Sequence, residues 1–160
     1  GMVGATHTLD MEKEEQMLQL LVVTPTQLCK CCLRDMYKRG SGKILNVASV
    51  GAFQPGPYTA SYYASKSYLY QYSQAIRLEA KKQGVQVCTL CPGSTRTHFF
   101  EKTGAKTPIW AMSPERVAKE AWEGLNADKA VVVPGMINRL LRLVPAQIKA
   151  YGVALLKKHT

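Results

Sequence analysis

Three polar residues in the middle of the chain have types and spacing suited to moving a proton on a small molecule: Ser49, Tyr62 and Lys66. A free phenol has a pKa of about 10 and is a poor acid or base at neutral pH. A neighbouring ammonium and the amino-terminal end of a helix both favour the phenolate. Tyr62 and Lys66 are four residues apart, so they share one face of a helix. The pair predicts proton transfer with a hydroxyl or carbonyl, whose oxygen Ser49 also holds.

The pair alone is a weak signal. A tyrosine and a lysine four residues apart arise readily by chance in a chain that is rich in both. The alternative interpretation is a half-buried core aromatic beside a solvated lysine.

Two predicted elements position these residues. Ile44, Leu45, Val47 and Ala48 form a short run that is apolar in both alternating positions, which is typical of a strand covered on both faces. Ser49 follows at its carboxyl end, the edge at which open α/β sheets bind ligands. After a loop rich in glycine and proline, residues 60–82 are predicted to form a helix that ends at Gly84. Tyr62 and Lys66 lie near the start of that helix.

The remaining elements alternate in the same way. Residues 8–39 are predicted to form one long helix, capped by Thr8 or Asp10, kinked at Pro25 and ended by Gly40. Further strands are expected over residues 85–90 and 130–133, a helix from the Ser113 cap to about residue 125, and a helical tail from residue 137 that Pro145 divides. Strands joined by helical crossovers predict an α/β fold, a parallel sheet with helices on both faces.

The chain is basic, with a net charge of +10, and most of the excess lies in its second half. Such a surface suits nucleic acid, anionic lipid or a phosphorylated ligand. We expect no nucleic-acid partner, because no recognised nucleic-acid motif accompanies the charge. The tail carries an apolar stripe, and three cations lie off it (Arg139, Arg142 and Lys149). Two interpretations stay open: a helix pair that packs on the domain or closes over a substrate, and peripheral contact with an anionic membrane.

Five cysteines accompany an acidic amino-terminal segment that does not resemble a secretion signal, which predicts reduced thiols and a cytoplasmic, possibly membrane-associated protein. The two C-x-x-C spacings, at 29–32 and 88–91, raise the alternative of zinc. The second pair falls on a predicted strand, where residues three apart point to opposite faces. We therefore predict buried thiols and no metal site.

The order and spacing of NVAS at 46–49, YYASK at 62–66 and CPGSTRT at 91–97 resemble the short-chain dehydrogenase/reductases. The resemblance implies a Rossmann-type fold and an NAD- or NADP-dependent enzyme that interconverts a carbonyl and an alcohol. It implies Tyr62 as the catalytic acid/base and Ser49 as the residue that orients the substrate carbonyl. Lys66 would bind the nicotinamide ribose and lower the pKa of Tyr62. The residues that border the nicotinamide and its phosphates would be Pro92, Gly93, Thr95 and Thr97.

The chain departs from that family in two ways. The glycine-rich TGxxxGxG turn that seats the cofactor's pyrophosphate is not found, and Gly1 aligns with the last residue of the family's NNAG motif. Residues 1–160 are therefore expected to be the carboxyl-terminal part of a single Rossmann-type domain, truncated at its amino terminus, with incomplete cofactor binding. In addition, Leu21 occupies the position at which the family usually has an asparagine that completes a tetrad with Ser49, Tyr62 and Lys66.

Two functions from different classes follow from these patterns. The first is the oxidoreductase, a homodimer or tetramer assembled through helices 8–39 and 60–82, as family members commonly are. The second is a non-catalytic remnant that binds a partner or associates with a membrane.

Overall fold

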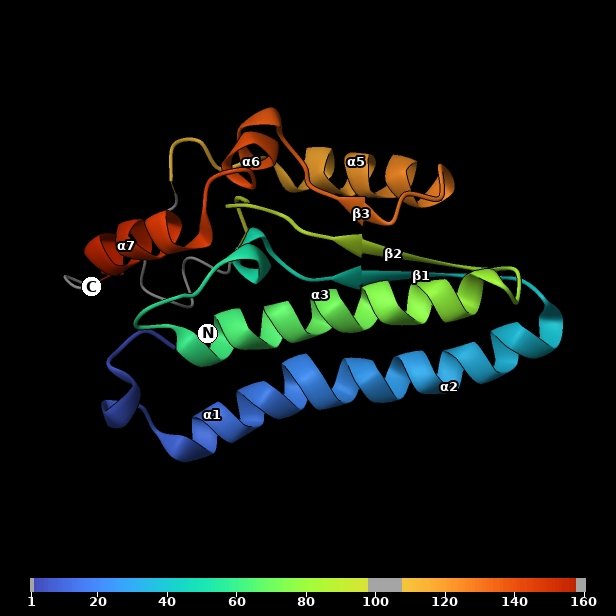
Figure 1. Ribbon diagram of the computed structural model, residues 1–160, viewed down its shortest axis with the longest axis horizontal. Coiled ribbons are helices and arrows are strands. Elements are labelled where there is room, and N and C mark those ends of the chain that lie inside the picture. Colours follow the sequence, from blue (N-terminus) through green and yellow to red (C-terminus); the bar gives the residue numbers. More distant parts are fainter. Residues whose placement is uncertain (1, 98–107, 158–160) are drawn as a thin grey trace.

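The computed structural model describes residues 2–97 and 108–157. Its sheet has three parallel strands in the order β1 (Gly42–Val47), β2 (Val85–Leu90) and β3 (Val131–Val132). In register, Gly42 faces Val85 and Val47 faces Leu90. β2 is therefore the central strand, and all three strands run toward the end of the molecule where Ser49 lies (Figure 1).

Helices cover both faces of the sheet, which confirms the α/β prediction. One face carries α1 (Met11–Leu18), the π-helical turn η2 (Gln19–Val23), α2 (Thr24–Arg39) and α3 (Ala60–Lys81) (Figure 1). The other face carries α5 (Pro114–Asn126), whose cap is Ser113 as expected. Short 3-10 turns, η1 (Thr6–Thr8) and η3 (Val50–Phe53), precede α1 and α3. The chain ends in α6 (Met136–Leu141) and α7 (Ala146–Lys157), divided near Pro145.

The alternation of side chains along β2 explains why both faces are covered. Val85 and Val87 pack into the cluster formed with α2 and α3, while Cys88 and Leu90 pack into the cluster formed with α5. Successive residues of a strand point to opposite faces, so an apolar residue at nearly every position requires a helix layer on each side. No helix in the described part of the chain is long and apolar enough to cross a membrane.

The long amino-terminal helix differs in detail from the prediction. It begins at Met11 rather than at residue 8, because the Asp10 side chain accepts a hydrogen bond from the Lys13 amide and caps it. Pro25 does perturb the helix, but the perturbation is a π-helical turn over the preceding residues. Proline has no amide hydrogen, so the turn before it must rearrange its hydrogen bonds.

A buried polar cluster fixes α2 and α3 against β1. The Asn46 side-chain amide donates to the Ser73 hydroxyl at 2.8 Å, and that hydroxyl donates to the Leu69 carbonyl at 2.6 Å. The Asn46 side chain also contacts the Cys29 thiol of α2. Asn46 and Ser73 are both buried, so these polar groups have no access to water and depend on one another.

The two helix-to-strand turns meet at the opposite end of the sheet. Gly40 ends α2 and Gly84 follows α3, and both have a positive φ, at 66° and 72°. A Cβ atom added to Gly84 would lie 2.3 Å from the Gly40 carbonyl oxygen, whereas one added to Gly40 would meet nothing within 4 Å. Gly84 is thus required both by its backbone conformation and by the close approach of the neighbouring turn.

The buried cluster leads to a first prediction. Asn46→Ala leaves a small void and removes the partner of buried polar groups, so it should lower the free energy of unfolding by about 1–3 kcal/mol. Asn126→Ala is the matched control, because Asn126 also makes two side-chain hydrogen bonds but is exposed. Its effect should stay within about 0.5 kcal/mol. Urea denaturation followed by circular dichroism measures both, and equal losses would contradict the role assigned to Asn46.

Candidate active site

The three residues predicted to do chemistry lie on adjacent elements. Ser49 directly follows β1 and caps η3, and its hydroxyl oxygen accepts a hydrogen bond from the Gly51 amide at 3.1 Å. Tyr62 and Lys66 lie in the first two turns of α3. The helix starts where it does because the preceding Gln54–Thr59 loop contains Pro55, Gly56 and Pro57, which do not continue a helix.

The structure brings the three side chains together. The Ser49 hydroxyl hydrogen-bonds to the Tyr62 phenol. The Lys66 ammonium lies 5.9 Å from the centre of the Tyr62 ring and donates a hydrogen bond of 2.9 Å to the Val47 carbonyl. Ser49, Tyr62 and Lys66 therefore form one cluster at the carboxyl end of β1, where the sequence placed them.

Burial governs the ionisation of the cluster. Desolvation raises the pKa of Tyr62 above its ordinary value, and the hydrogen bond from Ser49 offsets only part of that rise. Desolvation also lowers the pKa of Lys66. The expectation that Lys66 and the helix terminus lower the pKa of Tyr62 does not match this balance. Burial is the largest influence on its pKa, so Tyr62 is a neutral phenol at neutral pH.

A buried thiol lies next to the cluster. Cys91 follows β2, and a hydrogen bond with the Ser49 backbone and the positive charges of Arg142 and Lys66 favour its thiolate. Burial outweighs them and raises the pKa of Cys91 to about 12. Cys91 is therefore a neutral packing residue and no nucleophile at neutral pH. All five cysteines are free thiols, but only Cys29, Cys88 and Cys91 are buried; Cys31 and Cys32 are exposed on α2, so the prediction of buried thiols was wrong for these two. Within residues 2–97 and 108–157, no three His, Cys, Asp or Glu side chains gather as metal ligands.

A hollow of about 550 Å³ opens beside Tyr62 and Lys66. Its other wall is formed by the amino-terminal segment and by one face of α1 and η2 (Met2, Lys13, Gln16, Met17, Leu20 and Leu21). Sequence reasoning missed most of these residues. The signal that identifies them is their helical spacing: positions 13, 16, 17, 20 and 21 recur at intervals of three and four residues and so share one face.

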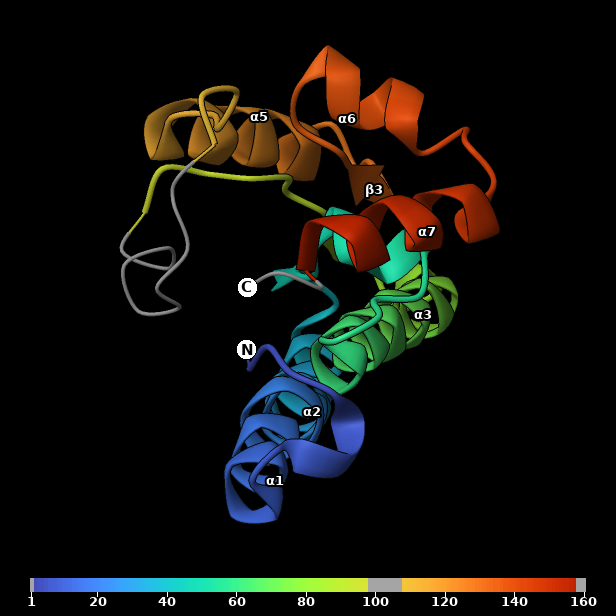
Figure 2. The same ribbon diagram turned by 90° about the vertical axis from the view of Figure 1, so that its left-hand side faces the viewer.

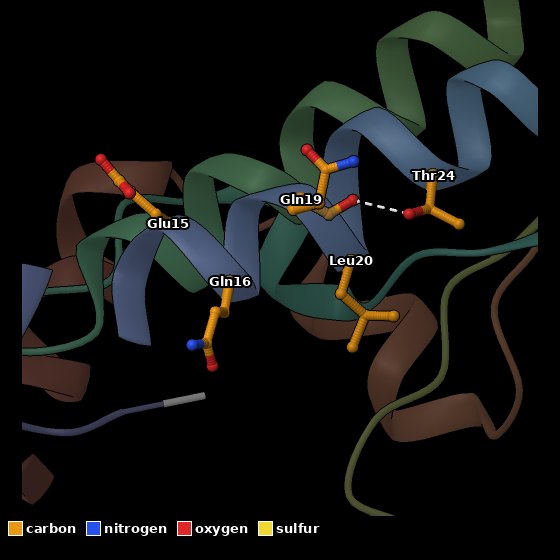
Figure 3. A pocket seen from close by; sticks show the side chains of 5 residues that line it. All are labelled: Glu15, Gln16, Gln19, Leu20 and Thr24. Carbon is orange, nitrogen blue, oxygen red and sulfur yellow. Dashed lines mark hydrogen bonds between the residues drawn. The ribbon is translucent and has the colours of Figure 1, made fainter. Parts of the chain in front are cut away.

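Leu21 was expected near the Lys66 side of the site, and it lines the same hollow as Tyr62 and Lys66. It belongs to the π-helical turn that precedes Pro25. In this turn the Thr24 hydroxyl donates to the Gln19 carbonyl at 2.8 Å (Figure 3). A second hollow, lined by Glu15, Gln16, Gln19, Leu20 and Thr24, adjoins the turn and contains none of the three cluster residues.

The predicted cofactor-binding residues follow β2 at the same end of the sheet. The Pro92 carbonyl accepts a hydrogen bond from the Val50 amide, which ties this segment to the residue after Ser49. The Thr95 hydroxyl donates to the Gly93 carbonyl, and Thr95 bridges to Met112. Pro92, Gly93 and Thr95 are partly buried and Thr97 is exposed. Residues 98–107, in the loop over residues 94–112, lie outside the described part of the chain.

The sequence that forms this site also matches a known protein family. The family described as short chain dehydrogenase matches residues 1–108. The chain belongs to this family. Among its relatives, 7beta-hydroxysteroid dehydrogenase of Clostridium sardiniense is 28% identical over 140 residues, which cover 86% of this chain and 53% of the relative. Mouse 17-beta-hydroxysteroid dehydrogenase 13 is 33% identical over 145 residues, covering 84% and 47%. The chain thus spans about half the length of these curated relatives.

Solved structures of short-chain dehydrogenases share the fold. A short-chain dehydrogenase from Sphingobium yanoikuyae, solved in complex with NADPH, aligns with a TM-score of 0.81 at 24% identity. The alignment covers 95% of this chain and 61% of that one. The prediction of a Rossmann-type parallel sheet is confirmed by this match.

The hydrogen bond between Ser49 and Tyr62 leads to a second prediction. Ser49→Ala removes a contact that favours the phenolate, so the pKa of Tyr62 should rise further. Ser67→Ala is the control, because Ser67 lies on the same helix but its hydroxyl donates to the Ala52 carbonyl. An NMR pH titration of the tyrosine Cζ signals, assigned with Tyr62→Phe, measures the change. A Tyr62 signal that titrates at the same or a lower pH in Ser49→Ala would be inconsistent with the contact.

Proposed function

We propose that this chain is the carboxyl-terminal part, over residues 1–160, of a single-domain oxidoreductase that uses NAD or NADP to interconvert a carbonyl and an alcohol. The observation that carries the proposal is the cluster of Ser49, Tyr62 and Lys66 beside one hollow at the carboxyl end of β1. Membership of the short-chain dehydrogenase family supports it. The substrate is a small molecule with a carbonyl or hydroxyl group.

The side chains present fit the nicotinamide half of such a cofactor. Tyr62 and Lys66 line a hollow with room for a ligand and offer a phenol and an ammonium as hydrogen-bond donors to ribose hydroxyls. Pro92, Gly93, Thr95 and Thr97 lie on the segment bonded to the residue after Ser49 and would border the ring and its phosphates. The bound cofactor supplies or accepts the hydride. The pyrophosphate half of the site would come from a glycine-rich turn, which these 160 residues do not contain.

The protonation state of Tyr62 favours a direction. A neutral phenol donates a proton, and the substrate oxygen that a reduction leaves negatively charged is the group that needs one. Ser49 donates a hydrogen bond to the same oxygen and holds it near the phenol. Lys66, close to the ring, favours the phenolate that remains after the transfer. At neutral pH the described site is thus prepared for the reduction of a carbonyl.

We infer the assembly and the location from the exposed helix faces and the free thiols. The outward faces of α2 and α3 expose apolar side chains such as Leu28 and Leu78, which suits a homodimer or tetramer built on these helices. Free thiols suit the cytoplasm. The competing function, a non-catalytic module that binds a partner or associates with a membrane, is supported by Leu21, which lines the hollow in the place of an asparagine.

The proton donor can be tested directly, with the glycine-rich unit of a relative supplied by fusion or co-expression. Tyr62→Phe keeps the ring and removes the proton, so turnover of a ketone with NADPH or NADH should fall by at least about a hundredfold. Tyr63→Phe is the matched control, because the adjacent ring packs between Gly51 and Gly56 and turnover should change little. Comparable turnover in Tyr62→Phe and the parent would refute the assignment.

The departure at Leu21 gives a fourth prediction, measured in the same supplemented protein. Asparagine at this position would place a polar side chain in the hollow that Tyr62 and Lys66 line and allow proton resupply to the phenol. Leu21→Asn should therefore raise turnover, at a cost of about 1–3 kcal/mol in the free energy of unfolding unless the amide finds partners. Leu18→Asn, on the same long helix and outside the hollow, is the control. Unchanged or lower turnover in folded Leu21→Asn would show that an asparagine at this position does not aid proton resupply to Tyr62.

A further inference from the structure

The last helix, α7, turns its apolar stripe away from the protein. Ile148, Tyr151 and Leu155 are 62%, 76% and 72% exposed. Their spacing of three and four residues puts them on one face, and Gly152 on the same face has no atom near its Cβ position. An apolar stripe that packs on its own domain would be buried, so this one is not the packing face of α7.

The opposite face of α7 and the preceding turn attach the helix to the domain. The Lys149 ammonium donates to the Phe53 carbonyl at 3.3 Å. The Arg142 guanidinium lies 4.8 Å from the centre of the Phe53 ring and 3.4 Å from the Tyr70 hydroxyl. Val153 and Lys157 are also partly buried on the attached side. The attachment thus uses the cations, and the outward orientation of the apolar stripe follows from it.

The exposed apolar surface extends into the neighbouring segment. Ile137 and Leu140 of α6 are 65% and 61% exposed, and Leu143 in the turn is 80% exposed. We call these residues together with Ile148, Tyr151 and Leu155 the tail surface. Figure 2 shows α6 and α7 one after the other at the end of the molecule beyond the sheet.

The charge around the tail surface determines what it can face. Residues 129–157 contain five Lys or Arg side chains and no Asp or Glu, and one of the five, Arg139, is paired with Glu120 of α5. Two copies of this surface brought face to face would juxtapose like charges, which opposes self-association. An anionic lipid headgroup layer is complementary instead, and its acyl boundary accepts the aliphatic side chains. Tyr151 has the amphipathic ring that is enriched at the boundary between lipid and water.

We propose that the tail surface binds the surface of an anionic lipid bilayer and anchors the protein to it peripherally. Ile148, Tyr151 and Leu155 enter the headgroup and acyl boundary. Arg142 and Lys149, whose partners within the protein are neutral groups, keep the positive charge that attracts the lipid phosphates. Because the opposite face of α7 is attached beside Phe53, four residues after Ser49, α7 lies between the bilayer and the η3 segment of the candidate active site. The proposal does not depend on the oxidoreductase activity.

The test is flotation of the whole 160-residue chain with vesicles, because aggregated protein sinks. The chain should float with vesicles of phosphatidylcholine and phosphatidylglycerol in a ratio of about 3:1 and weakly with phosphatidylcholine alone. The triple variant Ile148→Gln, Tyr151→Gln, Leu155→Gln should lose binding at least about tenfold. Glutamine keeps the helix propensity high, and all three side chains are exposed, so the fold should persist in circular dichroism.

The matched control is Met11→Gln, Trp110→Gln, Trp122→Gln, which removes three apolar side chains that are 76%, 72% and 66% exposed and lie outside both the tail surface and the outward faces of α2 and α3. It should float like the parent. Equal binding by the tail variant, equal loss in the control, or equal flotation with neutral vesicles would overturn the proposal. So would sedimentation velocity showing a parent dimer that the tail variant dissociates, together with no flotation, because the occupant would then be a second copy.

Discussion

The register of α3 on β1 is the constraint on which the site depends. Two hydrogen bonds set it: the buried one from Asn46 to Ser73 and the one from Lys66 to the Val47 carbonyl. Asn46 and Val47 are neighbours on the strand, and Lys66 and Ser73 are two helical turns apart on one face of the helix. If the helix slid by one turn, both bonds would break and Ser49 would no longer meet Tyr62. A polar pair in an apolar layer therefore specifies one alignment, where apolar packing alone would tolerate several.

Burial determines the ionisation of Tyr62 and Lys66, and burying the Lys66 ammonium lowers the free energy of unfolding. The surroundings that keep water from Tyr62 also raise its pKa, and they lower that of Lys66, so each neutral form is favoured. The Lys66 ammonium retains the Val47 carbonyl as a partner. Because the pKa of Lys66 is lowered in the folded state, the ammonium opposes folding below that pKa, and the penalty is relieved as the pH rises toward the ordinary lysine value. Functional groups of this kind are held in place by the rest of the fold.

Much of this architecture could be predicted from the residues because it rests on local rules. Short runs that are apolar at successive positions predicted β1 and β2, and the Ser113 cap predicted the start of α5. Other features depend on tertiary contacts. The sequence stripe in the tail is compatible with inward or outward packing, and the contacts of Lys149 and Arg142 decide between them. The pKa of Tyr62 was expected to fall because Lys66 is visible in the sequence, whereas the depth of burial is not. Pro25 predicted an irregularity in the long helix, but its form as a π-helical turn could be seen only in the structure.

The contact between the Gly40 and Gly84 turns gives the two ends of the sheet different evolutionary freedom. A side chain at Gly84 would collide with the backbone of the other turn, so a substitution at Gly84 would have to push the turns that follow α2 and α3 apart. At the other end, Ser49 is followed by the short 3-10 turn η3 and Pro92 by an irregular segment, and such connections tolerate replacement more readily than the strands do. Sequence change can thus alter what these connections recognise while the close-packed turns keep the cluster of Ser49, Tyr62 and Lys66 in place. Relatives with the same scaffold can therefore change ligand through substitutions in these connecting segments and keep the same cluster of side chains.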